Sequence, residues 1–258
     1  MNLDKQRYCI QSVTNALDLL EQFQSGGGEL SFNHLVDSMH LSEDKVLRLL
    51  TTLEKRNYIE KDMTTGRCRL GLQALRLGQS AIRHMGLLRH ARPVLESQVH
   101  QHNETTYIAV LRDSFSICLD AVESSQPVRV VPRLGACLPT YCTAGGKAHL
   151  AFMKKKELLR HLPVGKLQRY TSNTITDRDH LLRHLQEVAE QGFAIDNEEL
   201  YVGVMCISAP LRDSIGSIVG TLNISGPVSR FTKHIIDEKL APLVKCGAAE
   251  ISGRLRSC

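Results

Sequence analysis

The apolar positions near the start of the chain recur with helical spacing. After Ser12, a residue type that caps helices, one stripe repeats at i, i+3, i+4 and i+7, and it consists of Val13, Ala16, Leu17 and Leu20. Three consecutive glycines at 26–28 end this pattern. The spacing predicts a first amphipathic helix whose apolar stripe faces a core.

Two further stripes follow at short intervals. Ser31 precedes the first of them, which consists of Phe32, Leu35, Val36 and Met39. Ser42 precedes the second, which consists of Val46, Leu49, Leu50 and Leu53. Glu43 and Asp44 favour a helix start after Ser42, because the helix dipole attracts negative charge to its first turn. The pattern predicts a short helix, a tight turn and a longer helix, which share one core with the first helix.

The longer of these helices keeps hydrogen-bond donors on its outer faces when its apolar stripe turns inward. The donors are Ser42, Lys45, Arg48, Thr51 and Thr52. Such side chains can contact phosphates and base edges, and a short helix, a turn and a second helix form the helix-turn-helix that fits a major groove. The sequence therefore predicts a DNA-reading helix.

A β-hairpin is predicted directly after this helix. Residues 58–61 and 67–70 have strand character, and the turn residues 64–66 lie between them. Arg67 would lie near the tip, where it could reach a phosphate or the minor groove. The hairpin resembles the wing of a winged helix-turn-helix. The same pattern also fits a packed subdomain with a solvated basic face, or a module that mediates protein contacts.

The rest of the chain alternates short strands with helices. The predicted strands cover 105–111, 116–121, 128–133, 192–196, 204–209 and 217–225. The predicted helices cover 72–82, 92–102, 144–162, 177–190 and 232–254. This order predicts an α+β fold with a mainly antiparallel sheet. We divide the chain into a winged helix-turn-helix domain at 1–75, a linker helix at 76–90 and a second domain at 91–258.

Composition adds few constraints. The 258 residues are 42% hydrophobic and 23% charged, which is typical of a globular protein, and the net charge of +5 permits a nucleic-acid partner without requiring one. No apolar run is long enough to span a bilayer, and residues 1–11 lack a secretory pattern. The 8 cysteines include no CxxC pair, so we expect reduced thiols and a cytoplasmic protein.

The segment Thr143-Ala-Gly-Gly-Lys-Ala148 carries the most specific chemistry in the second domain. Gly145 and Gly146 at the start of a helix expose backbone N–H groups, which favour a carboxylate or another small anion. A nucleotide-binding P-loop is excluded, because it requires glycine at Tyr141 and serine or threonine at Ala148. The glycines alternatively serve only a tight turn.

Several motifs together resemble the IclR family of bacterial transcriptional regulators. They are Gln11–Val13 with Ala16–Leu20, the helix Val46–Leu53, Cys68–Gly71, Thr143–Ala148, Gly192–Glu199, Gly203–Pro210, and Ser225–Pro227 with Arg230. They follow the family's order over nearly the whole chain. One departure is the sequence His40–Lys45, where the family usually has Gly-Leu-Pro-Lys-Ser-Thr. The two acidic residues in it shift the expected DNA contacts toward Lys45, Arg48, Thr51 and Arg67.

The resemblance implies a GAF-like second domain that binds small, often carboxylate-bearing metabolites. Family ligand positions fall on the amides of Ala144 and Gly145 and on the side chains of Asp196, Cys206, Asn223 and Ser225. Leu138, Tyr141 and Val204 are the expected apolar wall. The family also implies a homodimer or a dimer of dimers on a double-stranded operator. Asp196 alternatively pairs with a cation, and Cys206 alternatively fills the core.

Enzyme and metal interpretations receive less support. No GxSxG elbow occurs, and no cysteine has a histidine at a recognisable catalytic spacing. His180 and His184 could share a metal on one helix, but Arg178 and Arg183 beside them indicate a solvated basic face. A redox- or metal-responsive regulator that uses Cys137, Cys142 and Cys206 stays an alternative, as does a thiol enzyme. We expect no catalytic residue, metal or cofactor.

Overall fold

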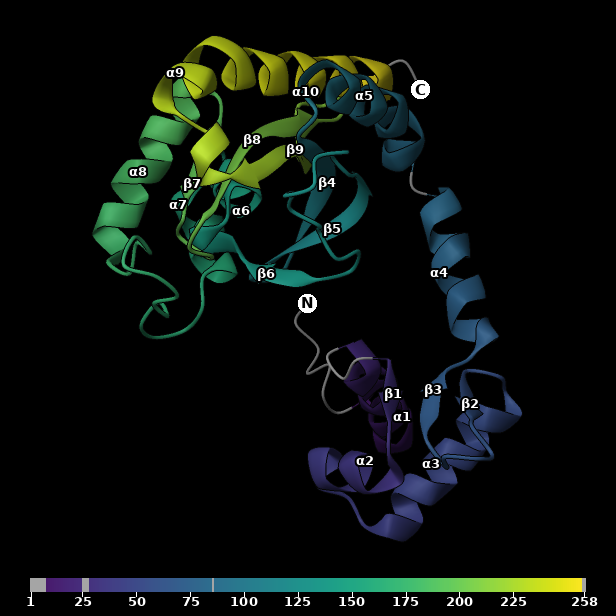
Figure 1. Cartoon of the computed structure of the whole chain (residues 1–258). Coiled ribbons are helices and arrows are strands. Elements are labelled where there is room, and N and C mark those ends of the chain that lie inside the picture. The colour runs from purple at the N-terminus through teal and green to yellow at the C-terminus, as the bar shows by residue number, and fades with distance from the viewer. Residues whose placement is uncertain (1–7, 25–27, 85, 257–258) are drawn as a thin grey trace. The chain divides into compact units, whose positions relative to one another are not determined.

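The computed structural model describes residues 8–24, 28–84 and 86–256, which belong to two compact units. The first unit covers residues 1–84 and the second covers 85–258, so the division falls within the predicted linker at 76–90. Figure 1 shows both units and labels their elements. No helix among the described residues is long and apolar enough to cross a membrane.

The first unit is a helical bundle with a small sheet. Its elements are α1 (Gln11–Glu21), a 3-10 turn (Gln22–Gln24), β1 (Glu29–Leu30), α2 (Phe32–Met39), α3 (Glu43–Lys55), β2 (Ile59–Lys61), β3 (Cys68–Leu70) and α4 (Leu72–His84). The sheet is antiparallel in the order β1-β3-β2. The predicted helices and hairpin are therefore present, and β1 is a short strand that periodicity did not predict.

Local residue chemistry explains some of these boundaries. The hydroxyl of Ser31 accepts a hydrogen bond from the His34 N–H at 3.2 Å, which caps α2. His40 ends α2 in the left-handed conformation, with φ 51°, and so turns the chain toward α3. The predicted cap at Ser12 is wrong, because α1 begins at Gln11 and Ile10 occupies its N-cap without a side-chain bond.

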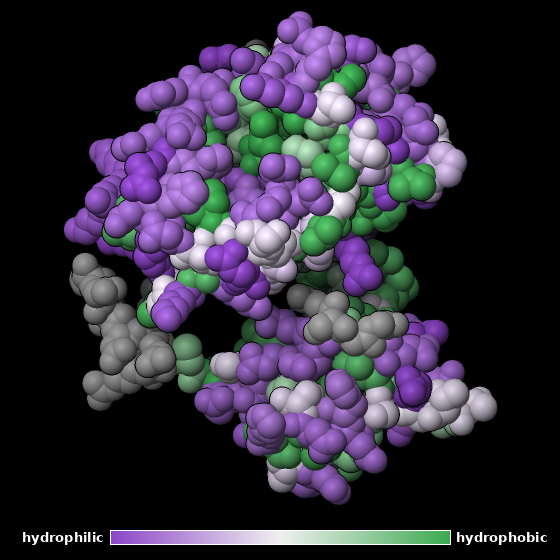
Figure 2. Space-filling model, turned by 60° about the vertical axis from the view of Figure 1, so that its left-hand side comes forward, coloured by the Kyte–Doolittle hydropathy of each residue, from purple (hydrophilic) through white to green (hydrophobic). Residues whose placement is uncertain are grey.

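The predicted apolar stripe of α1 faces the core only in part, through Leu20. Val13 and Leu17 are 52% and 54% exposed, whereas Leu19 is fully buried. The core of the first unit contains Leu19, Phe23, Leu30, Leu35, Val46, Leu50, Leu53, Ile59 and Cys68. The helix is apolar on more than one side, so spacing alone did not determine which side packs against α2 and α3. On the face drawn in Figure 2, apolar side chains gather in patches on a mostly hydrophilic surface.

The second unit is built on a six-stranded sheet. Its strands are β4 (Thr105–Arg112), β5 (Phe115–Val122), β6 (Cys137–Pro139), β7 (Ala194–Asn197), β8 (Val204–Arg212) and β9 (Ile218–Pro227). The order is β6-β5-β4-β9-β8-β7, and each neighbouring pair is antiparallel. The predicted α+β class with a mainly antiparallel sheet is confirmed.

Helices cover both faces of this sheet (Figure 1). On one face lie α5 (Gly86–His102) and α10 (Ala241–Arg256), which pack on apolar residues such as Ile108, Ile207 and Leu222. The other face carries α6 (Ala144–Leu150), with α8 (Arg178–Gln191) packed against it. Because strand side chains alternate between faces, Cys206, Asn223 and Ser225 point to the side of α6.

Three predicted elements of the second unit differ from the structure. Residues 128–133 are irregular and form no strand. The predicted helix at 144–162 is divided into α6, α7 (Lys155–Leu158) and a 3-10 turn (Leu159–His161). The predicted helix at 232–254 begins as α9 (Lys233–Ile235), continues through a π-helical segment (Ile236–Leu240) and becomes α10. Apolar periodicity marked all three segments but could not detect these local changes of backbone geometry.

Candidate functional site

The outer surface of α3 presents the side chains predicted to read DNA. Lys45, Arg48, Thr51 and Thr52 are exposed, and so is Ser42 at the N-cap. The hydroxyls of Thr51 and Thr52 donate to the carbonyl oxygens one turn earlier, at 2.8 and 2.7 Å. Among the described residues, no ion pair involves Lys45 or Arg48. Their charges are therefore available to a phosphate backbone.

The hairpin of β2 and β3 follows α3 in the chain, as the wing of a winged helix-turn-helix does, and it carries a further cation. Its turn is organised by Asp62, whose carboxylate accepts the N–H groups of Thr64 and Thr65 at 2.7 and 2.9 Å. These bonds lower the pKa of Asp62. Arg67 is exposed at the end of this turn, whereas Arg69 is held by Glu60 at 3.0 Å. Arg67 is thus the wing arginine without an ion pair in the described part of the chain.

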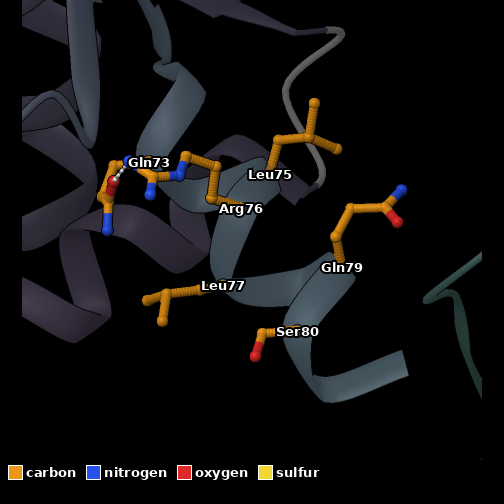
Figure 3. A pocket seen from close by; sticks show the side chains of 6 residues that line it. All are labelled: Gln73, Leu75, Arg76, Leu77, Gln79 and Ser80. Atoms are coloured by element: carbon orange, nitrogen blue, oxygen red, sulfur yellow. Dashed lines mark hydrogen bonds between the residues drawn. The ribbon is translucent and has the colours of Figure 1, made fainter. Parts of the chain in front are cut away.

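Two hollows in the first unit are surface features of its helices. One, of about 600 Å³, lies along α4 and is lined by residues of that helix alone (Figure 3). The other, of about 500 Å³, is an apolar groove between α1, α3 and α4. The groove is lined by Ser12, Val13, Ala16, Leu17, Leu20, Leu49, Thr52, Leu53, Tyr58 and Leu77. It contains Val13 and Leu17, the residues of the α1 stripe that are about half exposed.

The second unit contains a pocket of about 440 Å³ on the side of the sheet that carries α6. Its lining combines apolar and polar side chains from all six strands of the sheet, from α6 and from two irregular segments. The lining residues are Tyr107, Cys118, Val130, Val131, Pro132, Arg133, Ala136, Leu138, Thr143, Ala144, Asp196, Leu200, Tyr201, Val204, Cys206 and Ser225. The size and the few convergent polar groups are typical of a small-molecule site.

Asp196 is the buried acidic group of this pocket. Its side chain is 6% exposed, and its Oδ1 accepts the N–H of Glu199 at 2.7 Å. Burial raises the pKa of Asp196 to about 7, although the ammonium of Lys147 and the backbone N–H groups oppose this rise. Near neutral pH the carboxyl group therefore exists in both protonation states.

Lys147 supplies the nearby buried positive charge. Its side chain is fully buried on α6, and its Nζ forms an ion pair with Glu199 and lies 3.2 Å from Nε2 of His184. Burial and the ammonium of Lys147 lower the pKa of His184 to about 4. The imidazole is thus neutral at physiological pH and can accept a hydrogen bond from the lysine.

A hydroxyl and thiol cluster forms another part of the pocket wall. The hydroxyl of Tyr107 lies 3.4 Å from Sγ of Cys206. The hydroxyl of Ser225 donates to the Tyr107 hydroxyl at 3.5 Å. Burial raises the pKa of Tyr107 well above its usual value and that of Cys206 to about 12. Both groups are therefore neutral hydrogen-bonding groups at physiological pH.

The structure brings six of the nine predicted effector-binding residues into the pocket lining. They are Leu138, Ala144, Asp196, Val204, Cys206 and Ser225. Tyr141, Gly145 and Asn223 are not among the lining residues. Tyr141 packs in an apolar cluster beneath α6, and its hydroxyl donates to the carbonyl oxygen of Gln168 at 2.7 Å.

Gly145 and Gly146 allow α6 to pack closely on its neighbours. A Cβ atom at Gly145 would lie 2.7 Å from Oδ1 of Asn223, and one at Gly146 would lie 2.2 Å from the carbonyl oxygen of Thr140. The N–H of Gly146 donates to the Thr143 hydroxyl at 3.3 Å. The expectation that these glycines expose their backbone N–H groups is therefore wrong for Gly146, whose role is packing.

Sequence reasoning missed several lining residues. Tyr107 lies on a correctly predicted strand, but nothing in its spacing identified the side of the sheet on which the pocket forms. Val130, Val131, Pro132 and Arg133 belong to the segment predicted as a strand, and the Thr105 hydroxyl holds this segment by donating to the carbonyl oxygen of Val130 at 2.7 Å.

The cysteine and histidine alternatives gain no geometric support. Cys142 is buried beneath α6, and burial raises its pKa to about 12, so its thiol stays protonated. His184 contacts the buried lysine, while His180 is exposed. Within residues 8–24, 28–84 and 86–256, no group of three or more histidine, cysteine and acidic side chains could hold a metal ion.

Comparisons with known proteins agree with this arrangement. The model of the bacterial transcriptional regulator IclR C-terminal domain matches residues 79–253, and that of the IclR helix-turn-helix domain matches 12–63. The HTH-type transcriptional repressor AllR of Salmonella paratyphi A is 29% identical over 95% of this chain and 90% of its own length.

Solved structures show the same fold. The IclR protein of Thermotoga maritima is 28% identical, with a TM-score of 0.76 over 95% of this chain and 99% of its own. An IclR homologue from Microbacterium hydrocarbonoxydans, complexed with 4-hydroxybenzoate, is 21% identical, with a TM-score of 0.82 over 96% of this chain and 100% of its own. With family models matching both units, this chain belongs to the IclR family of bacterial transcriptional regulators, with a helix-turn-helix that binds DNA and a C-terminal domain that binds an effector.

Proposed function

We propose that this chain binds a DNA operator through α3 and the β2–β3 wing, and that a small carboxylate-bearing metabolite in the pocket of the second unit changes the operator affinity. The observation that carries the effector part is the pocket itself, where six predicted ligand positions meet around a cavity of about 440 Å³. A ligand that binds one arrangement of the regulator more tightly shifts the population toward it.

The proposed DNA contacts are made by Ser42, Lys45, Arg48, Thr51 and Thr52 of the α3 region, together with Arg67 of the wing. These contacts are supported by the exposure of the side chains. Among the described residues, Lys45, Arg48 and Arg67 also form no ion pair. Phosphate contacts would position the domain, and the α3 side chains would contact base edges.

The proposed effector contacts include a carboxylate in a pocket whose positive side chain is Arg133. The complex of the homologous protein with 4-hydroxybenzoate, which carries a carboxylate on an aromatic ring, supports an acid of this general size. Leu138 and Val204 would form part of the apolar wall, with Ala144, Cys206 and Ser225 around the polar end.

We further propose a homodimer or a dimer of dimers as the operator-binding form. One recognition helix contacts too few base pairs for useful specificity, so paired half-sites are needed. The apolar groove that contains Val13 and Leu17 gives the first unit an unused surface that a second copy could cover.

Operator binding is tested first by genome-wide selection of bound DNA, followed by titration of a selected site at fixed salt. Replacing both Lys45 and Arg48 by alanine should weaken binding at least tenfold, because two phosphate or base contacts are lost, and it should reduce the salt dependence. Arg160→Ala, in the second unit, is the control and should bind normally. Unchanged operator affinity in the double variant would exclude α3 as the reading helix.

A further inference from the structure

The effector pocket contains two side chains of opposite charge. Asp196 lies in its wall and is 6% exposed, whereas Arg133 is an exposed residue of the lining. If Asp196 is ionised, a bound carboxylate would face a like charge across a partly enclosed cavity. Two carboxylates that share such a site cannot both remain ionised without a large electrostatic penalty.

The groups that surround Asp196 do not remove this penalty. From α6, the ammonium of Lys147 attracts its charge, but this lysine already forms an ion pair with Glu199 and contacts His184. Glu199, which follows β7 in the chain, adds a second negative charge and a backbone N–H donor. The lysine and Glu199 charges largely cancel, so the carboxyl group of Asp196 carries the variable charge.

The remaining neighbours are neutral at physiological pH. Cys206 on β8 and Cys142 beneath α6 are buried thiols, and Tyr107 on β4 is a half-buried phenol that bonds to Cys206. Burial raises the pKa of each of these groups. None of them can supply a positive charge to balance Asp196 together with a second carboxylate.

We propose that the pocket takes a monocarboxylate together with one proton, which Asp196 holds and donates to the ligand as a hydrogen bond. This inference rests on the proposed function, because it specifies the protonation state of that effector site. With Asp196 neutral, the ligand meets one hydrogen-bond donor and the positive charge of Arg133. The ligand class is therefore a small acid that binds as its anion. Where Asp196 is ionised beforehand, the proton that it takes up offsets the negative charge of the ligand.

The coupling has a defined direction. The free carboxyl group titrates near pH 7, so the fraction that can donate falls about tenfold from pH 6 to pH 8. The affinity for a carboxylate should fall about tenfold over that interval, and close to one proton should be taken up per ligand at pH 8. A ligand that offers a hydrogen-bond donor instead would prefer ionised Asp196 and bind more tightly as pH rises.

The experiment is calorimetric titration of the full chain with acetate, pyruvate, lactate, benzoate and 4-hydroxybenzoate, each compared with its amide. Titrations at pH 6, 7 and 8 give the affinities, and two buffers of different ionisation enthalpy at pH 8 give the number of protons taken up. Asp196→Asn supplies a permanent donor of the same shape, so its affinity for the acid should be equal at pH 6 and pH 8. Glu187→Gln, which removes an exposed carboxylate, should keep the pH dependence of the parent.

The expected result is an acid whose affinity falls about tenfold between pH 6 and 8 in the parent, with proton uptake that Asp196→Asn abolishes. Equal affinity at both pH values, proton release on binding, or no binding by any acid at pH 6 would overturn the inference. If the variant does not fold, the buffer comparison on the parent still decides. An acid that binds with proton uptake and leaves operator affinity unchanged would contradict the proposed function alone.

Discussion

The buried charges around α6 and the exposed apolar face of α1 depart from the usual distribution of polar and apolar residues in opposite ways. In the second unit, Lys147 is fully buried, yet its ammonium is paired with Glu199. In the first unit, Val13 and Leu17 are about half exposed and line an apolar groove. The buried charge has its partner within the chain, whereas the apolar face has none among the described residues of its own unit. The two regions therefore predict different responses to substitution.

Removing one member of the buried ion pair should have the largest effect on stability. Lys147→Met leaves Glu199 as an uncompensated buried charge and should lower the free energy of unfolding by about 3–5 kcal/mol. Urea unfolding followed by circular dichroism measures this loss. The double variant Lys147→Met/Glu199→Leu, which removes both charges, should recover most of it. A single variant within about 1 kcal/mol of the parent would show that the pair is not buried as described.

The buried carboxyl group of Asp196 should make stability depend on pH. Its pKa is about 7 in the folded protein and 3.8 for the unperturbed group, so its contribution to stability is present below pH 4 and is lost as pH rises through 7. Between pH 5 and 8 the parent should lose about 2–3 kcal/mol from this group, and Asp196→Asn should not. Urea unfolding at both pH values tests this difference, and parallel losses in the two proteins would assign the pH dependence to other groups.

A charge on the exposed face of α1 should have the smallest effect on folding but a visible effect on association. Leu17→Glu should change the free energy of unfolding by less than about 0.5 kcal/mol, because the side chain is already about half exposed. It should weaken self-association at least tenfold in sedimentation experiments, because a second copy would have to bury the new charge. Asp18→Ala, also exposed on α1, provides a matched control. Unchanged association of Leu17→Glu would show that this face is not the contact between copies.

The fold was largely predictable because its signals are local. The stripe Val46, Leu50 and Leu53 and the β2–β3 hairpin depend on spacing within a few residues, and both are present. The antiparallel sheet of the second unit followed from short strands separated by turns. The failures lie where several faces of an element are apolar, as in α1, or where an extended segment pairs with no strand, as at 128–133.

The effector pocket was predictable only in part. Asp196, Cys206 and Ser225 were found through motifs, but their neighbours Tyr107 and Arg133 come from segments about 60 to 120 residues away from them. Their proximity depends on strand order and on the path of an irregular segment. The sequence around Tyr107 or Arg133 therefore does not indicate that these residues lie near Asp196.

The order of elements, the polar face of α3 and the motifs that resemble the IclR family could be read along the chain, because these depend on neighbouring residues. Contacts in the folded protein were needed to establish that Val13 and Leu17 of α1 stay exposed, that Gly146 serves packing, and that Lys147 and Glu199 form a buried pair beside Asp196. Burial and pairing depend on residues far apart in the sequence, and these distant contacts set the protonation states of the pocket.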